Sequence, residues 1–207
     1  MMDPGGARDA ARADLSRLLA ACYYEPGPEL AEEQVFDALA GAAALIDPGL
    51  EAAARRVGAA FASARLEDLL VDYTRLFLGP VKALAQPYGS VWLEADGGLM
   101  RDSTMAVAAL YVEGGFEIAE EFRELPDHVA AELEFLYLLR FKIAQARMAG
   151  DTAALAAVDA LRRRFLGQHL GVWTAPFSAA VRAGAQTDFY RALAELTERF
   201  VGIESQA

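Results

Sequence analysis

The sequence predicts an all-α protein, a single-chain bundle of roughly nine to eleven helices in two lobes. Apolar residues return every three or four positions in nearly every segment, which is the period of an amphipathic helix. Strand-like alternation is confined to "SVWLEA", residues 90–95, where an extended piece is expected. The 207 residues are 55% hydrophobic and 24% charged, which fits one compact domain, or two small lobes that share a core.

Five apolar stripes mark the expected helices. They comprise Leu15, Leu18, Leu19 and Cys22; Leu50, Ala54, Val57 and Phe61; Leu66, Leu69, Leu70, Tyr73, Leu76 and Phe77; Leu155, Val158, Leu161 and Phe165; and Phe189, Leu193, Leu196 and Phe200. Each stripe gives a helix one apolar face that must be buried against a neighbour. No internal repeat at solenoid periods is visible.

Two breaks divide the chain. The stretch "FLGPVKALAQPYGS", residues 77–90, stops a helix at a Gly-Pro pair and predicts an ordered loop. Residues 113–127 carry Gly114, Gly115 and Pro126, and glycine pairs weaken a helix. We therefore expect an N-terminal lobe over residues 1–112, a hinge over 113–127 and a C-terminal lobe over 128–207. Such a hinge would allow a monomer or a domain-swapped dimer.

The charge balance bears on partners and compartment. A net charge of −11 and a pI near 4.7 argue against nucleic acid, because a phosphate backbone would be repelled. The single cysteine, Cys22, can form neither an internal disulfide framework nor a redox pair. Neither a secretory signal nor a membrane-spanning run is recognisable, so a cytoplasmic protein is expected.

The most informative stretch is "ELPDHVAAELEFLYLLRF", residues 124–141, which predicts a central helix with almost no polar face. Pro126 suits the first turn of that helix, and Asp127 can satisfy free amides there. Because the helix is buried but its start must reach the surface, Asp127, His128 and Glu132 are expected at the rim of a cleft. For Asp127, capping and recognition both stay open.

A metal or catalytic function has little support in the sequence. His128 and Glu132 lie one helical turn apart, but His169 is the only other histidine, so a closed metal site lacks ligands. No catalytic motif or phosphate-binding loop is present, and no cofactor is predicted. An acid–base role for Asp127 and His128 would need a nucleophile that the sequence does not supply.

Four motifs together resemble a known family. "LPDHVAAELEFLYLL", "DYTRLFLGP", "PYGSVWLE" and "FLGQHLGVWTAPF" are similar in type and order to stretches of the TorD/DmsD/NarJ family of redox-enzyme maturation chaperones. The resemblance covers roughly residues 10 to 202. It implies a cytoplasmic chaperone, not an enzyme, that binds the twin-arginine signal peptide or the immature catalytic subunit of a molybdoenzyme and delays export until the cofactor is inserted.

The resemblance also implies a peptide-binding surface. Its residues are Tyr73, Leu76, Phe77, Pro87, Tyr88, Trp92, Asp127 and His128. Some members carry a tryptophan where this chain has Val81, which bears on peptide selectivity. For Tyr73, Leu76 and Phe77 the spacing is equally that of a helix core, whereas Tyr88 and Trp92 lie in a loop, where large aromatics more often serve recognition.

Physical arguments support the same partner. A peptide with a cationic front and an apolar middle requires carboxylates beside an apolar groove. Glu132 and Glu134 point apart on the helix, so only one of them can face the cleft. The negative charges of Glu120, Glu121 and Glu124 would attract a cationic peptide and speed its association. Burying roughly 500 Å² of apolar peptide surface would contribute on the order of 12 kcal/mol to the binding free energy. Ordering the peptide and losing its rigid-body freedom would consume about half of this, so a dissociation constant near micromolar is expected.

One alternative function stays open at this point. The chain could be an α-helical scaffold or a hydrolytic enzyme that uses an Asp127 and His128 rim. That alternative predicts turnover or a bound metal in the purified protein, and the chaperone interpretation predicts neither.

Overall fold

The protein, described here from a computed structural model, is all-α. The structure describes residues 4–79, 82–95, 97–118 and 124–207. Within these residues the helices are α1 (Pro4–Ala21), α2 (Glu29–Glu32), α3 (Val35–Ile46), α4 (Pro48–Ser63), α5 (Leu66–Tyr73), α6 (Gly89–Leu93), α7 (Asp102–Glu113), α8 (Val129–Ala149), α9 (Thr152–Gln168), α10 (Leu170–Gly184) and α11 (Asp188–Gln206). A single π-helical turn, η1 (Thr74–Leu78), continues α5. The all-α prediction and the range of helix numbers are confirmed.

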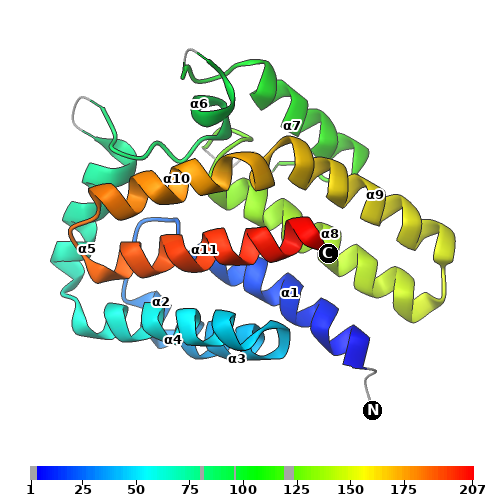
Figure 1. Cartoon of the computed structure of the whole chain (residues 1–207), viewed down its shortest axis with the longest axis horizontal. Helices are drawn as coiled ribbons and strands as arrows, with labels where there is room; N and C mark the ends of the chain where they lie inside the picture. Colours follow the sequence, from blue (N-terminus) through cyan, green and yellow to red (C-terminus); the bar gives the residue numbers. More distant parts are fainter. Residues whose placement is uncertain (1–3, 80–81, 96, 119–123) are drawn as a thin grey trace.

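The helices pack around a common core. In Figure 1, α10, α11 and α4 lie one below another, while α1 and α8 cross behind α11. The most extensive pairing joins α1 to α8, which lie more than 100 residues apart in the chain. In Figure 1, α6 lies above α10 and α7 lies above α9, on one side of the bundle.

The helix ends follow from local capping. The Asp47 carboxylate accepts hydrogen bonds from the backbone nitrogens of Gly49 and Leu50 at 2.8 and 3.0 Å and so starts α4. Asp151 starts α9 in the same way, accepting from the nitrogen of Ala154 at 2.9 Å. These short-range bonds fix where each helix begins.

The extended piece expected at residues 90–95 is not present. Residues Gly89–Leu93 form α6 instead, a helix of five residues. The backbone nitrogen of Ser90 at its start is bonded by the Asp127 carboxylate at 2.8 Å. Because that partner lies 37 positions away, local alternation alone gave the wrong secondary structure.

The glycine pair at the expected hinge ends α7. The nitrogen of Phe116 donates to the carbonyl of Tyr111, and that of Gly115 to the carbonyl of Val112, both at 2.9 Å, with Gly115 at φ 71°. This is the Schellman arrangement, which requires a left-handed residue and favours glycine. The pair therefore has a local structural role, and its function as a hinge stays a prediction.

The apolar core runs without a break from helices before residue 113 to helices after residue 127. It includes Leu15 and Leu19 of α1, Leu133 and Leu136 of α8, and Phe200 of α11, all fully buried. This agrees with the expectation of a shared core, while the division into two lobes is not tested. Within the described residues no helix is long and apolar enough to cross a bilayer.

Candidate functional site

The start of α8 is joined to the loop before α6. The nitrogen of Gly89 donates to the carbonyl of Asp127, and the nitrogen of Val129 donates to the carbonyl of Pro87, both at 2.8 Å. Between these bonds, Tyr88 and His128 form an isolated antiparallel bridge. Two of the four sequence motifs are thus held together by backbone hydrogen bonds.

Asp127 lies beneath this junction. Its side chain is 1% exposed, and its Oδ2 atom accepts the hydrogen bond from the Ser90 nitrogen. Asp127 therefore caps α6. The sequence had suggested that it would cap the helix that follows it, α8. Its Oδ1 atom has no hydrogen-bond partner among the described residues.

His128 is the residue that caps α8. Its Nδ1 atom accepts from the Ala130 nitrogen at 3.2 Å, and its ring contacts those of Tyr24 and Tyr88 at centroid distances of 6.5 and 5.3 Å. Burial lowers the pKa of His128 to about 4, against the opposing effect of Glu124 and Asp127. The imidazole is therefore neutral at pH 7 and acts as an aromatic wall and cap.

Glu132 is fully buried one turn further along α8. Its Oε2 atom accepts a hydrogen bond from the Trp173 indole nitrogen at 3.1 Å. Burial raises its pKa well above the ordinary value, and the negative Asp127 adds to that rise. Asp127, His128 and Glu132 are all buried, so the expectation that they lie at the rim of a cleft is wrong. A hydrolytic function that uses Asp127 and His128 would therefore lack an exposed acid–base group.

The other predicted site residues separate into buried and surface positions. Leu76, Phe77 and Pro87 are buried, the first two within the core. Tyr73, Tyr88 and Trp92 are half-buried. The Trp92 indole donates to the carbonyl of Gln86 at 2.9 Å and packs edge-on against Phe177. Val81, Glu120 and Glu121 lie outside the described residues.

The half-buried tyrosines lie beside acidic side chains. We define a tyrosine–glutamate patch as Tyr24, Tyr73, Tyr88, Glu124 and Glu134. The Tyr24 hydroxyl donates to Glu134 Oε1 at 2.9 Å and the Tyr88 hydroxyl to Glu124 Oε2 at 2.6 Å. Burial, and then the negative Glu124, raise the pKa of Tyr73 to about 12.

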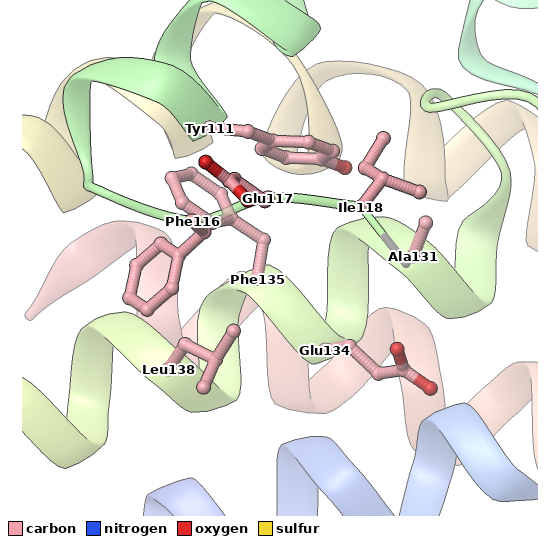
Figure 2. A pocket seen from close by; sticks show the side chains of 8 residues that line it. All are labelled: Tyr111, Phe116, Glu117, Ile118, Ala131, Glu134, Phe135 and Leu138. Carbon is pink, nitrogen blue, oxygen red and sulfur yellow. The ribbon is translucent and has the colours of Figure 1, made fainter. Parts of the chain in front are cut away.

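An apolar pocket of about 200 Å³ adjoins the patch. Figure 2 shows the segment with Phe116, Glu117 and Ile118 crossing over α8, from which Ala131, Glu134, Phe135 and Leu138 extend, while Tyr111 comes from α7. Its lining is Tyr111, Phe116, Glu117, Ile118, Ala131, Glu134, Phe135 and Leu138. Because Glu134 belongs to both features, an acidic and an apolar surface are continuous at this residue.

Sequence reasoning missed Tyr24 and the walls of this pocket. Tyr24 follows α1, and its hydrogen-bond partner Glu134 lies 110 positions away. The pair Tyr23 and Tyr24 was a visible aromatic signal, but only the first ring is a core residue. Phe116 and Ile118 fell inside the segment expected to be a hinge.

Metal binding receives no support from the side-chain arrangement. Among the described residues, no group of three or more histidine, cysteine, aspartate or glutamate side chains is placed to hold a metal ion. The buried carboxyls of Asp127 and Glu132 accept hydrogen bonds from the Ser90 nitrogen and the Trp173 indole nitrogen. The polar side chains of Asp127, His128 and Glu132 therefore hold α6, α8 and α10 in place.

A comparison with known families decides the classification. The family model described as "Nitrate reductase delta subunit" matches residues 43–179, well over half of the chain. The chain belongs to this family, the TorD/NarJ family. The resemblance seen in the four motifs is thereby confirmed.

Individual relatives of this TorD/NarJ chain carry chaperone names. A perchlorate reductase assembly chaperone protein of Dechloromonas aromatica is 37% identical over 97 residues, 47% of this chain and 42% of the relative. The chaperone protein TorD of Shewanella loihica is 28% identical over 149 residues, which cover 70% and 64% of the two chains. TorD of Escherichia coli O45:K1 is 34% identical over 133 residues, covering 64% and 59%. The matches thus span less than two thirds of these relatives' own length.

One solved structure supports the fold. A redox enzyme maturation protein from Archaeoglobus fulgidus, described as putative, superposes with a TM-score of 0.55 over 92% of both chains at 19% identity. At this identity the likeness shows the TorD-like fold alone. The relatives of this TorD/NarJ chain are named as chaperones or maturation proteins, in agreement with the prediction that it is not an enzyme.

Proposed function

We propose that this chain is a cytoplasmic chaperone that binds the twin-arginine signal peptide of a molybdenum-cofactor oxidoreductase and delays export until the cofactor is inserted. One observation carries the proposal: an acidic, tyrosine-rich patch is continuous with an apolar pocket at Glu134. A twin-arginine signal has the same order of chemistry, a cationic front followed by an apolar middle.

The patch has the groups that an arginine side chain needs. Glu124 and Glu134 each accept a hydrogen bond from one tyrosine hydroxyl, and a carboxylate has capacity for further donors. A guanidinium group can pair with these oxygens in a fork and stack on a tyrosine ring. Lysine offers neither the planar fork nor the stacking, so the patch should prefer arginine.

The pocket suits the apolar middle of the same peptide. Phe116, Ile118 and Leu138 contribute apolar surface, and Ile118 is 38% exposed. A bulky side chain of the peptide that enters this space would bury apolar area worth about 1.5–3 kcal/mol. The direction of the peptide would follow from the shared Glu134, with arginines on the side of Tyr24 and apolar residues under Phe116.

The buried residues of the four motifs support this surface from beneath. In the proposal, Tyr73, Tyr88 and Trp92 contact the peptide directly. Asp127, His128 and Glu132 hold α6 and the start of α8 in register, and Leu76, Phe77 and Pro87 anchor the loop. Substituting any of this second group should weaken peptide binding through displacement of the patch.

The proposed client follows from the relatives and the signal-peptide chemistry. One relative is named for assembly of perchlorate reductase, and others are named TorD. By analogy, the partner here is the catalytic subunit of a molybdoenzyme. We propose a monomer or a dimer that exchanges lobes at Gly114 and Gly115, a hinge role added to the helix-ending role of this pair.

Photo-crosslinking tests the proposed site and the peptide direction together. Two twin-arginine peptides are needed, one with a benzophenone beside the arginines and one with it in the apolar segment. The first should label segments that contain Tyr24, Tyr73 or Tyr88, and the second should label residues 116–118 or 131–138. A twin-lysine peptide serves as the control. Labelling elsewhere, or equal labelling by the lysine control, would contradict the proposal.

A further inference from the structure

The apolar pocket beside the tyrosine–glutamate patch has a neighbour on the same helix. We call the two the first and the second pocket. The second has a volume of about 190 Å³ and lies between the end of α7, the middle of α8 and α9. On α8 its lining begins at Leu139, directly after Leu138, the last residue of α8 that lines the first pocket. Because Phe135, Leu138 and Lys142 follow one another at steps of three and four, both pockets lie along one face of α8.

One segment of the chain lies across this face and separates the two pockets. Residues 114–118, which we call the strap, follow α7 and cross over α8 (Figure 2). Gly114 lines the second pocket, whereas Phe116, Glu117 and Ile118 line the first. The position of the strap therefore decides whether this face of α8 offers two short pockets or one longer groove.

Lys142 of α8 fastens the strap. Its ammonium group donates a hydrogen bond to the carbonyl of Gly114 at 2.6 Å and lies 4.4 Å from the centroid of the Phe116 ring. A cation over an aromatic face is attracted by the negative face of the ring. One side chain thus holds both the backbone of the strap and its largest ring against α8.

The strap is closely packed where the two pockets meet. A Cβ atom on Gly114 would lie 3.0 Å from ring atoms of both Phe116 and Phe135. The Phe116 ring meets that of Phe135 edge-on, with 5.5 Å between the centroids. Phe116 therefore forms the wall that ends the first pocket on the side of Lys142.

We propose that Lys142 is a positioning residue for the selection of signal peptides. By holding Phe116 against α8, it limits the size of the apolar side chain that the first pocket accepts. The inference rests on the proposed function, in which this pocket receives the apolar middle of the peptide. Lys142 acts through Phe116 and makes no contact with the peptide itself.

The geometry of α8 indicates how strong this restriction is. From Ala131 to Leu138 the helix rises about 10 Å, and from Ala131 to Lys142 about 16 Å. The apolar segment of a signal peptide has roughly 7–15 residues and would extend about 10–22 Å as a helix. With the strap in place, the first pocket takes only the beginning of such a segment. Displacing Phe116 would join the pockets and admit larger side chains.

Hydrogen exchange tests the fastening of the strap without any peptide. The amides of Gly115 and Phe116 donate to the carbonyls of Val112 and Tyr111, so their exchange reports opening of the strap. Lys142→Met keeps the apolar stem but loses the charge and the donor, and both amides should exchange about tenfold faster. The control Lys82→Met removes the chain's other lysine, which is exposed in the loop before α6, and should leave these amides unchanged. Unchanged exchange in Lys142→Met would overturn the proposal.

Calorimetry with two twin-arginine peptides then tests selection. The peptides are identical except that one apolar residue is leucine in the first and 4-phenylphenylalanine in the second. Wild type should bind the leucine peptide about tenfold more tightly, because the larger side chain overfills the first pocket. Lys142→Met should reduce this preference to about threefold or less, whereas Lys142→Arg, which keeps a cation and a donor, should retain it. Circular dichroism would verify that all variants are folded.

The two experiments separate failure of this inference from failure of the proposed function. An undiminished preference for the leucine peptide in Lys142→Met would overturn the role of Lys142 while leaving peptide binding intact. Faster exchange in that variant, with neither peptide bound by any of the proteins, would contradict the proposed function and, with it, the selective role of Lys142. Rescue of the preference by Lys142→Arg would support the proposal, because a general loss of stability would not be reversed by restoring the charge.

Discussion

The indole nitrogen of Trp173 donates a hydrogen bond to the carboxyl of Glu132, 3.1 Å away, and both side chains are fully buried. This bond joins α10 to the first turn of α8 directly beneath α6. It fixes the helix whose first residues form the wall of the proposed peptide site. The site therefore depends on a polar contact that no exposed residue reveals.

Replacing Glu132 by glutamine should change stability in a pH-dependent way. Because burial raises the pKa of Glu132 in the folded chain, folding favours the protonated carboxyl, and this contribution to stability is lost as the pH rises above the ordinary value. Glutamine carries no charge and can still accept from Trp173. Glu132→Gln should therefore be more stable than wild type at pH 8, with a smaller advantage at pH 5.

Urea unfolding at both pH values measures this difference. Glu195→Gln, at a half-exposed pair with Arg56, provides a control for removing one surface charge. An advantage of equal size at pH 5 and pH 8 would mean that Glu132 is ionised in the folded protein, contrary to the expectation.

Gly89 should be intolerant of even a methyl group. A Cβ atom at this position would lie 2.9 Å from the Trp173 indole nitrogen and 3.1 Å from Glu132 Oε1. Gly89→Ala should therefore lower the free energy of unfolding by about 1–3 kcal/mol. Gly41→Ala in α3, where nothing lies within 4 Å, should raise it by up to about 1 kcal/mol.

Thermal or urea unfolding of the two glycine variants gives the answer directly. If Gly89→Ala were as stable as Gly41→Ala, the close approach of α6 to the Trp173–Glu132 pair would be wrong. Gly41→Ala serves as a control for the glycine-to-alanine exchange itself, at a helical position without a close neighbour.

His128 should make the protein less stable as the pH falls. Its pKa is about 4 in the folded chain and near the ordinary 6.5 when unfolded. Between these values the unfolded chain binds a proton that the folded chain does not, so stability declines with falling pH by up to about 1.4 kcal/mol per unit. His128→Asn keeps a capping acceptor for Ala130 but does not titrate.

The measurement is the difference in unfolding free energy between wild type and His128→Asn from pH 7.5 to 5.5. Loss of ring contacts with Tyr24 and Tyr88 adds a constant offset, so only the slope matters. The wild-type value should decline relative to the variant below about pH 6.5. Parallel curves would show that His128 titrates normally in the folded chain.

Local sequence patterns predicted the helices well because their causes are local. The spacing of apolar residues identified the buried faces of α4, α9 and α11. The Gly-Pro pair, which ends a helix, predicted the loop after η1. The central position of α8 followed from its lack of a polar face. The same spacing also indicated that Leu76 and Phe77 could be core residues, which they are.

The site was predicted less completely because its contacts are long-range. α6 begins through Asp127, 37 positions away, and Tyr24 meets Glu134 across 110 positions. Motif resemblance identified which segments matter, but it could not separate the buried Asp127 and His128 from the half-buried Tyr88 and Trp92. That separation depends on how α6 packs over α8 and α10.

A double-mutant calorimetric cycle tests the central claim, that the tyrosine–glutamate patch recognises the arginines of a signal peptide. A twin-arginine peptide and its twin-lysine counterpart are titrated into wild type, Glu124→Gln/Glu134→Gln, and the control Glu32→Gln/Glu33→Gln, which loses two exposed charges on and beside α2. We predict that wild type and control bind the twin-arginine peptide about tenfold more tightly than the twin-lysine peptide. The patch variant should bind the two peptides with almost the same affinity. An undiminished preference in a folded patch variant would contradict the account.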